Sequence, residues 1–127
     1  MRVFVGPILR SVLTENEISA LVLDFKQYKS NDKIPDNFGR DVPYHWPNSA
    51  VEEELFHLHL AAGSKWPNDL PQFFRTSDVH LIYSHGFSNS DDYVLLAILQ
   101  PNAHELARNR DIIDSLAKQA AVFRESH

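Results

Sequence analysis

Histidine is the residue type best suited to chemistry in this sequence. Seven histidines occur in 127 residues and cysteine is absent, so disulfides, thiol nucleophiles and thiolate metal ligands are excluded. An imidazole titrates close to neutral pH and can therefore take up or release a proton under ordinary conditions. The sequence predicts acid/base chemistry carried by histidines.

Two of the histidines are spaced as metal ligands could be. His57 and His59 stand two residues apart in an alternating segment, and on a strand such side chains project from the same face. Because no third ligand accompanies them in a motif such as HExxH, a partly exposed sheet face explains the pair better than a metal site does. We therefore predict no metal and no cofactor, and keep a metal-dependent hydrolase using His57 and His59 as an alternative.

A second group of basic side chains follows in the sequence. Arg75 precedes a strand that carries His80, and His104 and Arg108 stand four apart at the start of the last predicted helix, on one face. Metal-independent cleavage of RNA needs a base for the 2′-hydroxyl, a cation for the phosphorane and an acid for the leaving 5′-oxygen. These residues and His59 form the predicted catalytic set. Each residue also has a purely structural interpretation. Arg75 would belong to a turn, His80 would be a hydrogen-bonded sheet residue, and His104 with Arg108 would lie on a solvated helix face.

The first half of the chain predicts a strand, a helix and a long loop. Residues 2–10 begin with valines at every second position, which is typical of a short strand. Thr14 and Glu17 have the spacing of a capping box, and apolar residues at helical intervals predict a helix over 15–29. Residues 30–50 contain three prolines and little periodicity, which indicates a loop of functional length.

The second half predicts three strands followed by a helix. Alternation over 54–60 and apolar runs over 79–85 and 93–99 indicate strands, the last two joined as a hairpin and the final one central. A helix begins after Pro101, with Asn109 as a candidate break. This order predicts an α+β fold, in which an N-terminal helical region and a C-terminal helix pack on one face of an antiparallel sheet.

Length and charge limit the class of protein. A chain of 127 residues with 43% hydrophobic residues fits one domain, 1–127. The absence of a signal-like or membrane-spanning apolar run predicts a cytoplasmic protein with no membrane association. The formal charge of −5 argues against a surface that grips free RNA by itself, since phosphate contacts depend on Lys and Arg.

Several short segments, in order along nearly the full chain, resemble the YafO family of toxins. No single one is specific, but together they keep the same order. They are MRVF at the start, FGRD (38–41), HLHLA (57–61), RTSDVHLIY (75–83), LLAILQP (95–101), HELAR (104–108) and AVFR (121–124).

The resemblance implies a RelE/YoeB-like fold and a ribosome-dependent endoribonuclease toxin that cleaves translated mRNA and is neutralised by a YafN-like antitoxin. It also implies roles for residues: His80 falls near the catalytic basic position of a strand, His104 near the terminal acid, and Arg75 at a turn arginine, with His59 and Arg108 in matching motifs. The ribosome would then position the message and offset the acidic charge. A noncatalytic protein that blocks translation remains the alternative from another class.

Overall fold

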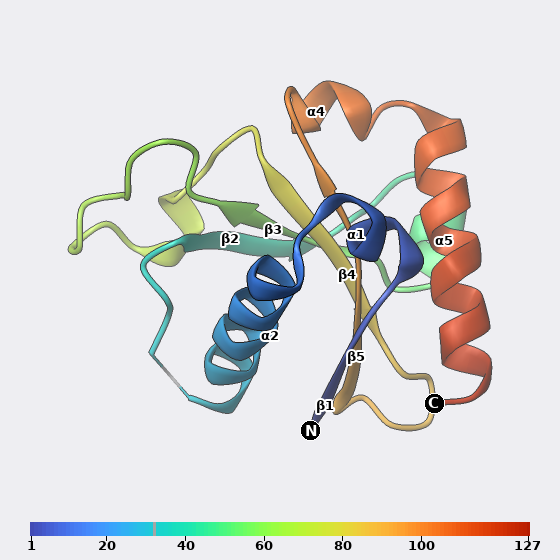
Figure 1. Cartoon of the computed structure of the whole chain (residues 1–127). Coiled ribbons are helices and arrows are strands. Elements are labelled where there is room, and N and C mark those ends of the chain that lie inside the picture. The colour runs from blue at the N-terminus through green and yellow to red at the C-terminus, as the bar shows by residue number, and fades with distance from the viewer. Residues whose placement is uncertain (32) are drawn as a thin grey trace.

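A five-stranded mixed sheet forms the centre of the structure, a computed structural model that describes residues 1–31 and 33–127 (Figure 1). The strands lie in the order β1-β5-β4-β3-β2, and each neighbouring pair is antiparallel except β1 with β5, which is parallel. The strands are β1 (Arg2–Val5), β2 (Phe38–Pro43), β3 (Phe56–Leu60), β4 (His80–His85) and β5 (Asp92–Leu99).

Helices cover both faces of this sheet. The long helices α2 and α5 lie on opposite sides of it (Figure 1), where each packs on its own hydrophobic core. Among the described residues, no helix is long and apolar enough to cross a bilayer. The helical segments are α1 (Pro7–Val12), α2 (Glu15–Ser30), α3 (Asn48–Glu52), the 3-10 turn η1 (Gln72–Phe74), α4 (Ala103–Leu106) and α5 (Arg110–Glu125).

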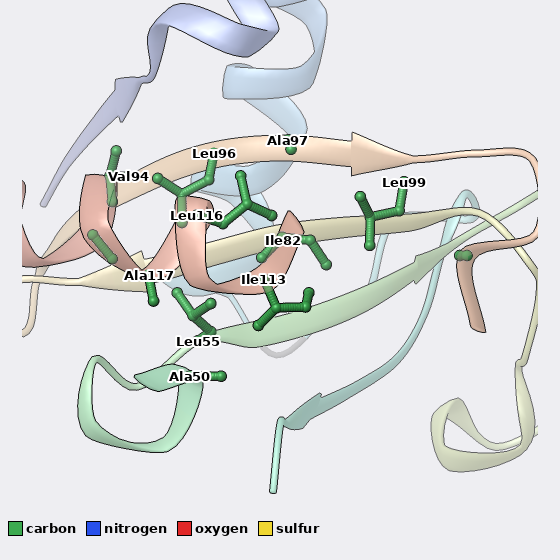
Figure 2. Packing of buried hydrophobic residues seen from close by; sticks show 12 residues of the cluster. Ala50, Leu55, Ile82, Val94, Leu96, Ala97, Leu99, Ile113, Leu116 and Ala117 are labelled. Carbon is green, nitrogen blue, oxygen red and sulfur yellow. The ribbon is translucent and has the colours of Figure 1, made fainter. Parts of the chain in front are cut away.

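Alternation along the strands separates the two cores. On β4, Ile82 joins the core under α5, whereas Leu81 and Tyr83 join the core under α2. Figure 2 shows Ile113 and Leu116 of α5 directed at the sheet. His57, His59 and His80 have the same strand parity as Ile82, so they share the α5 face, as the predicted alternation required.

Several predicted elements are confirmed. The helix over 15–29 is α2, and its capping box is formed: the Thr14 hydroxyl accepts from the Glu17 amide, and the Glu17 carboxylate accepts from the Thr14 amide. The strands over 54–60, 79–85 and 93–99 correspond to β3, β4 and β5. The predicted break is also present: α4 ends at Leu106, and Asn109 caps α5 by accepting from two backbone amides.

The predicted loop over 30–50 is wrong in part. Except for residue 32, which lies outside the described residues, it contains strand β2 and most of helix α3. β2 has little periodicity of its own because its register against β3 shifts between Phe38 and Asp41. A bulge of this kind breaks the alternation from which a strand is recognised.

The arrangement at the N-terminus and around the sheet also differs from the prediction. The opening strand ends at Val5, and residues 7–12 form helix α1 because Pro7 suits a first helical position. The sheet is mixed, since β1 adds in parallel beside β5. Helices pack on both faces because β4 and β5 carry apolar side chains on both sides, so each face must be covered.

Candidate active site

Four histidines meet at one end of the sheet on its α5 face. This histidine cluster consists of His57 and His59 on β3, His80 on β4 and His104 on α4. The ring centroids of His59 and His80 are 4.0 Å apart, those of His80 and His104 4.7 Å, and those of His57 and His80 5.3 Å. Three of the five predicted catalytic residues, His59, His80 and His104, are thereby brought together.

Strand register and a helix start produce this cluster. His59 lies directly opposite His80 in the antiparallel β3–β4 pair. Helix α4 is tied to Asp78, two residues before β4, because the Asp78 carbonyl accepts from the Ala103 amide at 3.1 Å and its carboxylate accepts from the His104 amide at 3.0 Å. The turn into β4 therefore positions His104 over the two strand histidines.

Asp78 orients the His104 ring. His104 Nδ1 lies 2.8 Å from Asp78 Oδ1, and since a carboxylate only accepts, Nδ1 carries the proton in this contact. The hydrogen bonds from the backbone and side chain of His104 lower the pKa of Asp78, so this carboxylate is charged at neutral pH. His104 keeps Nε2 for a ligand, and its side chain is 61% exposed.

Ser77 fixes the other two central rings. Its amide donates to His59 Nδ1 at 2.8 Å, so neutral His59 carries its proton on Nε2. Its carbonyl lies 2.9 Å from His80 Nε2 and can only accept, so His80 keeps a lone pair on Nδ1. The exposed fractions of His59 and His80 are 2% and 1%.

The buried rings are neutral at physiological pH. Burial, followed by the charge of His80, lowers the pKa of His59 to about 3. Burial likewise lowers the pKa of His80, although the hydrogen bond to Ser77 opposes the shift. A group with such a pKa does not hold a second proton at pH 7. His59 and His80 are thus neutral imidazoles behind the exposed His104.

His57 completes the cluster and is half-buried. Its ring stacks on Tyr44 with centroids 4.3 Å apart, and burial, followed by the charges of His80 and His104, lowers its pKa to about 4. Among the described residues, His57 Nδ1, His80 Nδ1 and the Tyr44 hydroxyl are buried without a hydrogen-bond partner. Unpartnered polar atoms are rare in folded proteins and cluster at functional positions.

Arg40 is a candidate functional residue that the sequence analysis missed. It lies on β2, its charge helps lower the pKa values of His57 and His59 after burial and the neighbouring histidines, and its guanidinium stacks 4.0 Å above the exposed Phe73 ring. Its Nε donates to the Phe73 carbonyl at 2.6 Å. The FGRD segment was the available signal, but the loop prediction gave Arg40 no position relative to the histidines.

The two predicted arginines are not brought into the cluster by any contact. Arg75 ends the 3-10 turn and holds the preceding loop, since its guanidinium donates to the carbonyls of Leu70 at 2.8 Å and Asn68 at 3.3 Å. Arg108 is exposed after α4, and the described residues offer its side chain no hydrogen bond or ion pair.

In this α+β fold, an Asp78–His104 pair lies over neutral buried imidazoles. This arrangement can carry out proton transfer, the chemistry of an acid/base site. The chain belongs to the YafO toxin family: the family model described as "Toxin YafO, type II toxin-antitoxin system" matches residues 26–125, which include the cluster and Arg40. It is 40% identical to the mRNA interferase toxin YafO of Escherichia coli (strain K12) over 130 residues, covering 98% of each chain. No solved structure matches. The predicted family membership is confirmed.

Proposed function

We propose that this protein is a cytoplasmic endoribonuclease toxin that cleaves mRNA on the ribosome and is neutralised by a YafN-like antitoxin. The observation that carries the proposal is the Asp78–His104 pair at the exposed edge of the histidine cluster. It supplies an oriented proton-transfer group in a chain closely similar to a protein named as an mRNA interferase.

The reaction class is transfer of the RNA phosphate to the neighbouring 2′-oxygen. A base removes the 2′-hydroxyl proton, the 2′-oxygen bonds to phosphorus, the bond from phosphorus to the 5′-oxygen breaks, and that oxygen takes a proton. A cation stabilises the extra negative charge of the phosphorane. The protein must therefore offer an accessible imidazole and a nearby positive charge.

Exposure distinguishes the roles within the cluster. His104 alone presents a largely exposed ring, so we assign it the proton transfer at the RNA, with the resulting imidazolium stabilised by Asp78. His80 packs edge to face against His104, and His59 lies behind it, so we assign both as positioning residues. Arg40 is the proposed phosphorane cation.

The other two predicted arginines receive supporting roles. Arg108 follows His104 by four residues and is exposed, which suits a phosphate contact outside the reacting centre. Arg75 uses its guanidinium within the 68–75 loop, so we assign it to holding the turn that carries Ser77. Ser77 in turn sets the proton positions of His59 and His80.

We propose that the reaction needs no metal. The proton-transfer group is already oriented by a carboxylate, and neither base nor acid requires a Lewis acid to act. The alternative metal-dependent hydrolase using His57 and His59 is less favoured, because His59 Nδ1 already accepts from the Ser77 amide and its Nε2 carries a proton.

Ribosome dependence accounts for the charge of the chain. A net charge of −5 gives weak attraction to free RNA. A ribosome that holds the message in place would supply the positioning that the protein surface does not. Purified protein should accordingly leave naked RNA intact at concentrations that cut translating message.

The test is a reconstituted translation reaction followed by primer extension of the message. New message ends that require both the protein and ribosomes support the proposal. Inhibited translation with intact message would establish the noncatalytic blocker instead. Because ribosomes need Mg²⁺, metal dependence is tested with a chelator selective for transition metals, and loss of cleavage there would favour the metal-dependent hydrolase.

A further inference from the structure

We propose that the buried side of the histidine cluster is also a binding site for a borderline transition metal ion of the Zn²⁺ class, and that this ion inhibits the toxin. His57 Nδ1 and His80 Nδ1 would be the principal ligands. The inhibitory effect rests on the proposed nuclease function, whereas the binding site itself does not.

The first observation is the convergence of ligand atoms. His57, His59 and His80 can each offer a ring nitrogen such that all three atoms lie within 4.8 Å of one another. Imidazole nitrogens are ligands that Zn²⁺, Cu²⁺ and Ni²⁺ favour, whereas Mg²⁺ and Ca²⁺ favour oxygen. A set made only of imidazoles therefore selects the transition metals.

The second observation is that the principal ligand atoms are free and buried. His57 Nδ1 and His80 Nδ1 are enclosed without a hydrogen-bond partner among the described residues, and the His80 side chain is almost fully buried. Because His80 Nε2 lies against the Ser77 carbonyl, which can only accept, the lone pair of neutral His80 is on Nδ1 and can bind an ion.

The third observation is the support behind each ring. His80 donates its other nitrogen, Nε2, to the Ser77 carbonyl, which is the arrangement that commonly orients histidines bound to metal. His57 is held by stacking on Tyr44. Both rings are therefore held in place, and the lone pair of neutral His80 is directed from Nδ1.

The geometry also predicts a site of moderate affinity. Zinc bonds of about 2.0–2.1 Å in a tetrahedral arrangement place ligand nitrogens roughly 3.4 Å apart, so nitrogens as far apart as 4.8 Å must approach. His59 can become a third ligand only by giving up its contact with the Ser77 amide. Solvent would complete the coordination, and the site should be reversible.

Inhibition follows from the position of His80. The His80 ring packs edge to face against His104, with centroids 4.7 Å apart, so an ion that draws the ligand nitrogens of His57 and His80 together would shift the ring that His104 packs against. His104, the proposed proton-transfer group, would then no longer be held in its reactive arrangement.

The site is tested by zinc competition between the purified protein and a colorimetric indicator. We expect one zinc per chain, and His57→Phe should weaken binding at least about tenfold, since phenylalanine retains the stacking on Tyr44 without a ligand atom. His45→Ala is the matched control: it removes an exposed histidine outside the cluster and should bind as the wild type does. If thermal melting shows that His57→Phe is unfolded, His57→Gln takes its place.

Inhibition is then measured as message cleavage on ribosomes over a zinc series. Each protein's cleavage rate is compared with its own rate without zinc: the wild-type rate should fall as zinc saturates the site, whereas the His57→Phe rate should stay constant over the series, which also controls for effects of zinc on ribosomes. Equal zinc binding by wild type and His57→Phe would overturn the site, and zinc-stimulated cleavage would overturn inhibition. A protein that binds zinc at the cluster but cuts no message under any condition overturns the proposed function, and the inhibition with it, while leaving the site standing.

Discussion

Two clusters of buried polar side chains lie on opposite faces of the sheet, and they differ in how completely their hydrogen bonds are satisfied. On the α2 face, a tyrosine–aspartate network joins Tyr28, Lys29, Asp41 and Tyr83. The Asp41 carboxylate accepts from both tyrosine hydroxyls at 2.7 Å, and Lys29 donates to the Tyr83 hydroxyl at 3.0 Å. On the α5 face, the histidine cluster leaves two ring nitrogens unpartnered.

We interpret the satisfied network on the α2 face as scaffold and the histidine cluster on the α5 face as the candidate site. A fully satisfied network in a low-dielectric interior makes one arrangement rigid, whereas free lone pairs remain available to a proton, a ligand or an ion. Adjacent residues of β2 link the two clusters, because Asp41 enters the network and the charge of Arg40 lowers the pKa of His59 after burial and the neighbouring histidines. The tyrosine–aspartate network thus holds the strand that carries the proposed catalytic cation.

Removing the exposed imidazole should have the largest effect. We expect His104→Ala to lower the rate of message cleavage by about 10²–10³-fold, the usual contribution of an acid/base group. The melting temperature should hardly change because the side chain is exposed. Primer extension after translation gives the rate, and His45→Ala, which alters an exposed histidine elsewhere, serves as the control. Wild-type cleavage by the His104 variant would remove the assigned role.

Removing the centre of the satisfied network should affect stability instead. Asp41→Ala leaves two tyrosine hydroxyls without their acceptor and Lys29 without its ion-pair partner 3.5 Å away, and we expect a loss of about 3 kcal/mol in the free energy of unfolding. Urea denaturation measures it. Asp36→Ala is the matched control, since among the described residues Asp36 forms only an exposed pair with Lys65, and it should cost less than about 0.5 kcal/mol. If both variants lose a similar free energy of unfolding, the tyrosine–aspartate network contributes no more to stability than an exposed ion pair.

Changing the partner of His104 should have an intermediate effect on activity. Asp78→Asn retains an oxygen for the His104 amide but removes the charge that stabilises the imidazolium, so cleavage should fall by about tenfold. The pH dependence of the cleavage rate should shift as well, which loss of a merely structural contact would not produce. Glu105→Gln neutralises a neighbouring exposed carboxylate on α4 and should leave both the rate and its pH dependence unchanged.

The smallest effect concerns stability against pH. Burial lowers the pKa of His57 to about 4, so between about pH 6.5 and pH 4 the unfolded chain binds a proton that the folded chain does not. The contribution of His57 to the free energy of unfolding is therefore complete above about pH 6.5 and decreases as the pH falls.

Wild type should therefore lose about 1 kcal/mol more than His57→Phe between about pH 7.5 and about pH 5.8. Urea denaturation of both proteins at the two pH values measures the difference. Asp78 and Asp92, whose pKa values are lowered by hydrogen bonds to His104 and to Arg2, titrate below this range and are common to both proteins. Equal losses would mean that His57 is accessible to protons in the folded state.

Local patterns were enough to predict most of the elements. The capping box and helical spacing predicted α2, and period-two alternation predicted β3 together with the face that its histidines share. These signals are local because capping and side-chain direction depend on near neighbours in the chain. Family membership was also available from segments whose order is preserved.

The sequence by itself determined the residue types for proton transfer and the strands that carry two of the buried histidines. Only the tertiary structure decided how they work. β2 exists through its pairing with β3 across a register shift, so Arg40 could not be placed from local pattern. The long-range contact between Asp78 and the start of α4 orients His104. The proton positions on His59 and His80 depend on Ser77, and the unpartnered nitrogens depend on burial, which no local pattern encodes.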